Sequence, residues 1–152
     1  MLKRHYDGQE ACSVAQTLEI VGERWTWLIV RDAFLGLTRF DEFQESLGIA
    51  RNVLADRLKR LVDAGVFERR LYAARPPRSE YVLTETGRDL FTALNALRQW
   101  GDEHLTDKPM RLLRTKADGT PVVAALVPLG TSELTQDEME LVPGPGFPRQ
   151  DR

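Results

Sequence analysis

Proline is distributed very unevenly along this chain, and that distribution constrains the fold more than any other feature. Of the eight prolines in 152 residues, only Pro76 and Pro77 fall between residues 1 and 105, whereas the remaining 47 residues hold six. Because proline lacks the amide hydrogen and clashes with the preceding turn, it breaks helices. The sequence therefore predicts a mainly helical domain over 1–105 and a short β-rich extension over 106–152, which ends in a flexible Pro/Gly-rich tail.

Apolar residues recur at helical spacing in five segments of the first part. The expected helices cover about residues 10–22, 23–35, 39–47, 51–64 and 84–105. The first four are expected to end at glycines, namely Gly22, Gly36, Gly48 and Gly65. Thr84 can cap the fifth helix, and Glu85 complements the dipole at its N-terminus.

A period of two replaces the helical period between the fourth and fifth helices. Residues 66–72 and 80–84 are rich in β-branched and aromatic side chains. The connection between them, residues 73–79, holds two prolines and two arginines. This pattern predicts a β-hairpin with a basic tip.

The extension carries its own turn signal. The pair Asp118-Gly119 lies between the apolar segments 110–116 and 121–127. Because Asp-Gly favours tight turns, these segments are expected to form a second hairpin. Residues 133–142 predict a turn of helix followed by a strand.

The composition excludes several classes of protein. Hydrophobic residues make up 42% and charged residues 29%, as in ordinary globular proteins. The longest apolar run, residues 122–127, is far shorter than the ~18 residues that indicate a membrane span. Residues 1–10 lack the apolar stretch of a signal peptide. We therefore expect a cytoplasmic protein with no membrane partner. Because the net charge is −2, any nucleic-acid site must be local.

The third and fourth helices are joined by a short turn that begins with Gly48, which is the helix-turn-helix pattern. The basic hairpin that follows makes the pattern a winged helix. Residues 51–78 hold eight basic and three acidic side chains, a net charge of +5. A helix fits the major groove of DNA, and wing arginines can clamp phosphate or enter the minor groove. A basic amphipathic helix alone is more often only a surface helix, but the complete order of elements favours DNA binding.

Specific residues along residues 6–105 also occur in the order and spacing of a known family. They are Trp25-Thr26, Leu28-Ile29-Val30-Arg31-Asp32, Arg39-Phe40, Leu54, Arg57-Leu58, Leu61, Gly65, Glu80-Tyr81, Leu83-Thr84 and Gly87. In this respect the sequence resembles the HxlR-type winged helix-turn-helix regulators, a MarR-like group. Cys12, about a dozen residues before the 22–25 turn, also matches.

The resemblance implies a bacterial transcription factor, cytoplasmic and nucleoid-associated when it is bound to DNA. Such proteins are homodimers that bind inverted-repeat operators on double-stranded DNA, often as repressors. It implies no cofactor and no enzymatic activity, and the sequence contains no phosphate-binding loop or dinucleotide fingerprint. The alternative is a winged-helix module that binds proteins rather than DNA, which would not need the +5 segment.

The resemblance places the start of the recognition helix at Ala50, Arg51, Asn52, Ala55, Asp56 and Arg57. Arg51 and Asn52 are the expected base-reading residues, because Arg bonds guanine and Asn bonds adenine in a bidentate manner. Arg57 either contacts DNA or is held by an acidic neighbour that orients the helix. Arg75 and Arg78 are the expected wing contacts.

A seam of mostly apolar residues on the last helix is the candidate dimer interface. Its members are Leu90, Leu94, Leu97, Trp100, Gly101 and Leu105. The alternative is that these side chains pack inside the same chain. The resemblance implies that the first and last helices of the domain join the dimer.

Effector and metal sites are the last expectations. Cys12 is either a redox sensor for oxidants or electrophiles or a small residue buried beside the dimer interface. A small ligand could instead bind an aromatic pocket formed by Trp25, Trp27, Phe34, Phe40 and Phe43, which otherwise belong to the core. Cys12, His5 and His104 are too scattered for a zinc site, so no metal is expected.

Overall fold

The computed structural model describes residues 6–147. The chain forms two compact units, and the division between them falls between Leu90 and Phe91. The sequence-based boundary at residue 105 assigns the last helix to the DNA-binding and dimerisation domain, and it stays a prediction. The fold is mainly helical with a β-hairpin wing, followed by a short pair of strands, as the sequence predicts.

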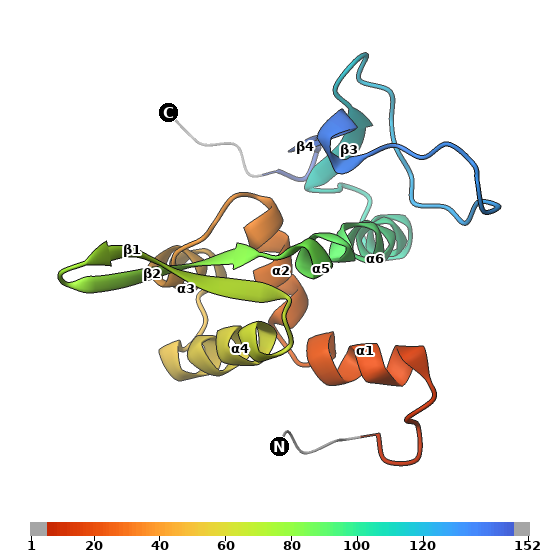
Figure 1. The fold of residues 1–152 in the computed structure, drawn as a ribbon. Coiled ribbons are helices and arrows are strands. Elements are labelled where there is room, and N and C mark those ends of the chain that lie inside the picture. Colours follow the sequence, from red (N-terminus) through yellow and green to blue (C-terminus); the bar gives the residue numbers. More distant parts are fainter. Residues whose placement is uncertain (1–5, 148–152) are drawn as a thin grey trace, which may run out of the picture. The chain divides into compact units, whose positions relative to one another are not determined.

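The first unit contains the predicted run of helices and then the hairpin (Figure 1). Its elements are α1 (Ser13–Val21), α2 (Thr26–Phe34), α3 (Phe40–Leu47), α4 (Arg51–Asp63), β1 (Phe67–Ala74), β2 (Pro77–Leu83) and α5 (Glu85–Arg88). The sequence places Trp25 inside the second helix, and this is wrong. Trp25 has a φ of 78° and caps α2 from outside, so the chain turns sharply between α1 and α2.

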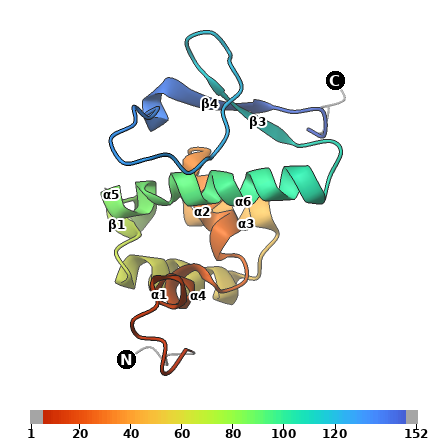
Figure 2. The same ribbon diagram turned by 90° about the vertical axis from the view of Figure 1, so that its right-hand side faces the viewer.

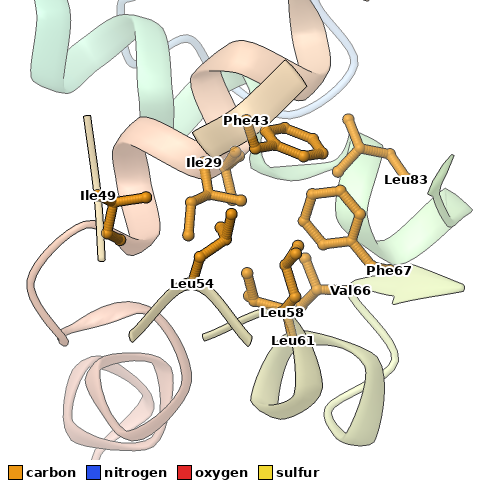
Figure 3. Packing of buried hydrophobic residues seen from close by; sticks show 10 residues of the cluster. Ile29, Phe43, Ile49, Leu54, Leu58, Leu61, Val66, Phe67 and Leu83 are labelled. Atoms are coloured by element: carbon orange, nitrogen blue, oxygen red, sulfur yellow. The ribbon is translucent and has the colours of Figure 1, made fainter. Parts of the chain in front are cut away.

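The core of this unit lies between the helices and the base of the hairpin (Figure 3). Its largest side chains are at most 1% exposed, among them Ile29, Phe43, Leu54, Leu58, Leu61 and Phe67. The rings of Phe43 and Phe67 meet edge to face, with 6.4 Å between their centroids. Gly87 packs so closely against this base that an added Cβ would lie 2.1 Å from the Val66 carbonyl oxygen. The core therefore fixes α4 and the hairpin against each other.

The hairpin is longer than the sequence predicts. β1 and β2 pair antiparallel from Phe67 opposite Leu83 to Ala74 opposite Pro77, with a bulge near Leu71. The strands therefore include most of the predicted 73–79 connection, and only Arg75-Pro76 lies between them. Pro76 lies in the turn, and Pro77 is the first residue of β2. Proline is tolerated at the first residue of a strand, although it has no amide hydrogen to donate.

The last predicted helix, over 84–105, is divided in two. α5 ends at Arg88, and α6 (Leu90–His104) begins after Asp89. The predicted cap at Thr84 is confirmed, because its Oγ1 accepts a hydrogen bond from the Gly87 amide at 3.0 Å. The same hydroxyl donates to the Gly65 carbonyl, so α5 is tied to the base of the hairpin.

The second unit consists of α6, β3 (Arg111–Thr115), the 3₁₀-helix η1 (Gln136–Glu138) and β4 (Met139–Pro143). β3 and β4 pair antiparallel, and α6 runs along one side of this pair (Figure 2). The predicted turn of helix and strand within 133–142 are thus confirmed. No helix among the described residues is long and apolar enough to cross a membrane.

The predicted hairpin between 110–116 and 121–127 forms only next to its turn at Asp118-Gly119. The Thr115 amide donates to the Thr120 carbonyl and the Val122 amide to the Leu113 carbonyl, both at 2.9 Å, and an isolated bridge joins Arg114 to Pro121. The strand that pairs with β3 along its length is β4. Beyond that bridge the Ala124 amide donates to the side chain of Gln99 at 2.8 Å. The chain therefore leaves the sheet before a second long strand can form.

Candidate nucleic-acid interface

The helix-turn-helix is formed by α3, the 48–50 turn and α4. Gly48 adopts a φ of 60°, and the buried side chain of Ile49 attaches the turn to the core. On α4, Leu54 and Leu58 are completely buried. The opposite face is exposed and carries most of the predicted recognition residues, which are Ala50, Arg51, Asn52, Ala55 and Asp56.

Arg51 lies at the first turn of α4 and is oriented by α3. Its guanidinium lies 4.8 Å from the ring centroid of Phe40, and its Nη1 is 3.7 Å from Asp41 Oδ1. Both charged side chains remain largely exposed. The sequence does not reveal this pairing, because it depends on how α3 and α4 pack.

Arg57, in contrast, is held inside the protein. Its Nη2 is 3.0 Å from Glu23 Oε2, its Nε donates to the Arg24 carbonyl at 3.2 Å, and its Nη1 pairs with Asp56. The side chain is only 15% exposed. Arg60 joins the same network through Asp56 at 3.0 Å. This geometry matches the orienting alternative for Arg57, and it connects α4 to the turn between α1 and α2.

The wing presents its charges to solvent. Arg69, Arg70, Arg75 and Arg78 are all exposed. Arg70 pairs with Glu68. Within residues 6–147, no ion pair or side-chain hydrogen bond holds Arg75 or Arg78. The tip of the hairpin therefore carries two cations that are free to meet an anionic partner.

Contacts at the start of α3 fix the wing. The Tyr81 amide donates to the Thr38 carbonyl at 2.7 Å, and the Arg39 guanidinium lies 5.0 Å from the ring centroid of Tyr72.

Glu42 Oε2 accepts hydrogen bonds from the amides of Arg39 and Thr38 at 2.9 and 3.0 Å. These two bonds lower the pKa of Glu42. Glu42 therefore caps the N-terminus of α3, a role that the sequence analysis did not assign to it.

A buried carboxylate joins α2 to α3. Asp32 is 1% exposed, and its two oxygens accept hydrogen bonds from Arg31 Nε at 2.8 Å and Ser46 Oγ at 2.7 Å. Removing a buried acceptor leaves its donors without partners. This pair of bonds therefore supports the position of α3 beneath the recognition helix.

The remaining candidate residues are dispersed. Cys12 is half-buried at the N-cap of α1. Phe43 lies in the core, and Trp25, Phe34 and Phe40 pack against it, so these aromatic residues belong to the core. Of the seam, Leu97, Trp100 and Leu105 are more than half exposed. Within the described part of the chain no three His, Cys, Asp or Glu side chains form a metal-binding group, and His5 lies outside that part.

Comparison with known families identifies the class of protein to which this chain belongs. A family model described as HxlR-like helix-turn-helix matches residues 20–109, which is more than half of the chain. The chain belongs to the HxlR-like helix-turn-helix family. It is a transcriptional regulator with a helix-turn-helix DNA-binding fold, and its relatives are named as regulators rather than enzymes.

Individual relatives of this HxlR-like regulator cover most of its length. It is 44% identical over 149 residues to the uncharacterized HTH-type transcriptional regulator Rv3095 of Mycobacterium tuberculosis, covering 96% of this chain and 92% of the relative. The solved structure of PA1607, described as a candidate transcription factor, shares 44% identity with a TM-score of 0.72 and covers 86% of this chain and 93% of that one. The redox regulator HypR in its reduced form is 32% identical with a TM-score of 0.56, covering 59% of this chain and 90% of that one.

Proposed function

We propose that this regulator is a homodimer that binds an inverted-repeat operator and represses transcription. The observation that carries the proposal is the outward face of α4. Arg51 and Asn52 are exposed on the first turn of a helix whose other face is buried leucine. The free arginines at the wing tip, Arg75 and Arg78, extend the same basic segment. A protein-binding module would not need this concentration of positive charge.

Each residue has a proposed role. Arg51 reads guanine and Asn52 reads adenine in the major groove, and the methyl group of Ala50 or Ala55 meets a thymine methyl. Asp56 and Arg57 orient the helix through the network with Glu23. Arg75 and Arg78 contact phosphate or the minor groove beside it.

Exposed apolar surface supports the dimer. On α1, Val14 is 67% exposed and Leu18 is 38% exposed, and on α6 Trp100 is 56% exposed. Apolar side chains gathered on one helix face and left uncovered indicate an interaction surface. A two-fold dimer would place two recognition helices on half-sites about 34 Å apart or a multiple of that distance.

The test is a fluorescence-anisotropy titration of the purified protein against DNA from its own upstream intergenic region, at two salt concentrations. We expect tight binding that weakens steeply with salt, because phosphate contacts release counterions. Unrelated duplex of the same length is the control. A dimer without preference for the upstream DNA would favour a remote operator, a required ligand or the protein-binding module. Transcription in vitro from the same promoter, which we expect to fall on addition of protein, tests repression.

Control by oxidants or electrophiles at Cys12 is the second part of the proposal. HypR, a structural relative, is a redox regulator. In a dimer, diamide can take two electrons and two protons from a pair of Cys12 thiols, which then form one intersubunit disulfide. We expect Cys12→Ser to keep DNA binding and to lose the response to diamide. A full response to diamide in Cys12→Ser would show that Cys12 is not the sensor.

A further inference from the structure

Helix α6 carries polar side chains on the face that lines the interior of its own unit. Asn95 is 4% exposed, and its Oδ1 accepts a hydrogen bond from Arg98 Nε at 3.2 Å. One turn later, Arg98 Nη1 pairs with Asp102 at 2.5 Å. Leu97 and Trp100, which point away from this row, are more than half exposed. A surface helix normally buries its apolar stripe and exposes its polar side, so this arrangement needs a reason.

The polar row borders a hollow within the second unit. The hollow has a volume of about 630 Å³. Arg98, Gln99 and Asp102 of α6 line one side. Apolar side chains line the other sides, namely Leu112, Leu113, Pro121, Val122, Val123 and Val142. Sites for small organic molecules have this character, because they are apolar cavities of roughly 300–1,000 Å³ with a few polar groups that fix orientation.

The charges of the lining point to an uncharged ligand. Arg98 is neutralised by Asp102, and Arg114 pairs with Glu140 at 2.8 Å. Glu103 also lies at the rim, but its side chain is 69% exposed and turned to solvent. An ionic ligand would therefore find no unpaired opposite charge among the side chains that line the hollow.

The hydrogen-bonding groups of the lining point to an acceptor on the ligand. Arg98 uses Nε and Nη1, and no bond within residues 6–147 uses its Nη2. Gln99 accepts from the Ala124 amide through Oε1, so the amide nitrogen of Gln99 keeps its donors. A carbonyl or ether oxygen would satisfy these donors without disturbing either ion pair.

We propose that this hollow is an effector site for an uncharged, apolar molecule that carries a hydrogen-bond acceptor. The ligand lies against the polar face of α6, whose opposite face carries Leu97 and Trp100 of the seam. Through α6, binding alters the dimer contact proposed for the seam, and with it the affinity of the dimer for DNA. This regulatory step rests on the proposed DNA-binding dimer, whereas the ligand site itself does not.

The site is tested first with Nile red, an uncharged apolar dye with a ring carbonyl, on the full-length protein. We expect a saturable rise in fluorescence with one site per chain. Val142→Trp fills the hollow from β4 and should weaken dye binding at least tenfold. Leu126→Asn is the control, because it removes a fully exposed leucine outside the lining and should leave the affinity unchanged. Non-saturable binding, or loss in Leu126→Asn alone, overturns the site.

A measurement on the wild-type protein covers the case in which Val142→Trp misfolds. In a sample with labelled Leu and Val methyl groups, Nile red should shift the NMR signals of Leu112, Val122 and Val142. The signals of Leu126 and Leu129, both fully exposed, should stay in place. Shifts confined to these exposed leucines would show that the dye binds the surface and would overturn the proposal.

The regulatory step is tested by gel-shift titration of upstream DNA with and without saturating Nile red. We expect the DNA affinity of the wild type to change at least threefold and that of Val142→Trp to stay constant. An unchanged affinity despite a filled site would overturn the effector role. If the wild type shows no preference for that DNA either with or without dye, the proposed function fails and the regulatory step fails with it. The dye titration still decides the ligand site in that case.

Discussion

At the scale of single residues, two arginines of the proposed interface should behave differently. Arg51 faces outward from the first turn of α4, and Arg78 lies beside the wing tip. We expect Arg51→Ala to cost about 1–3 kcal/mol on the preferred duplex and to relax the preference at one base pair. Arg78→Ala should weaken binding to all sequences by a similar factor and reduce the salt slope by about 1.

The measurement is anisotropy on the upstream duplex and on variants with single base-pair changes, at two salt concentrations. Lys116→Ala is the control, because Lys116 is an exposed cation of the second unit. Two arginine variants that bind every duplex like the wild type would show that neither side chain contacts DNA.

Asp32 should matter for stability rather than for DNA contact. Its carboxylate is buried and accepts hydrogen bonds from Arg31 and Ser46. We expect Asp32→Ala to lower the free energy of unfolding by about 1–3 kcal/mol, because two hydrogen bonds to a buried carboxylate are lost. Asp63→Ala, which removes only an exposed pair with Lys59, should cost less than about 1 kcal/mol. Urea unfolding followed by circular dichroism compares them, and equal losses would contradict the role assigned to Asp32.

At the scale of elements, the helices of the first unit follow from the sequence because each buries one apolar stripe with a period of 3.6 residues. Leu54, Leu58 and Leu61 are such a stripe, and all three are buried. The strands of the second unit could not be paired in this way. Asp118-Gly119 specifies a turn, but not which later segment completes the sheet, and β3 pairs with β4 across a long connection.

The candidate site, too, is only partly predictable from the sequence. The exposed face of α4 is predictable from its apolar stripe, and so is its basic character. The ion pairs that orient this face are not, because Arg57 with Glu23 and Arg51 with Asp41 join residues on different elements. Such pairs depend on how helices pack, and packing leaves no periodic signal in the sequence. The left-handed backbone conformation at Trp25 could not be predicted from the sequence either, since non-glycine residues rarely adopt it.

We expect the stability of the turn at Asp118, which follows β3, to depend on pH in the acid range. Its carboxylate accepts hydrogen bonds from the Thr115 hydroxyl and then from the Thr120 amide, and these lower its pKa from 3.8 to about 2. A lowered pKa stabilises the folded turn above pH 3.8, and the stabilisation is lost as the pH falls through about 2. Asp118→Asn should remove this acid dependence. An NMR titration of the Asp118 carboxyl and of the Thr120 amide checks this, and a midpoint near 3.8 would contradict it.

At the scale of the whole molecule, the proposed function needs two copies, because one α4 reads only one half-site. The seam supplies a direct test. Trp100 is 56% exposed on α6, and a charge there would be buried without a partner if the seam joins two chains. We expect Trp100→Glu to be monomeric by light scattering and to bind the upstream duplex at least tenfold more weakly, because each half-site must then be occupied separately.

The matched control for that variant is Leu126→Glu. Leu126 is fully exposed and lies outside the seam, so the same added charge should leave the mass and the DNA affinity unchanged. Circular dichroism must show that both variants are folded, since Trp100→Glu could lose DNA binding merely by unfolding. If the folded Trp100→Glu variant remains dimeric, the dimer interface does not lie at the seam on α6. The exposed side chains of α1, Val14 and Leu18, would then be the next surface to change.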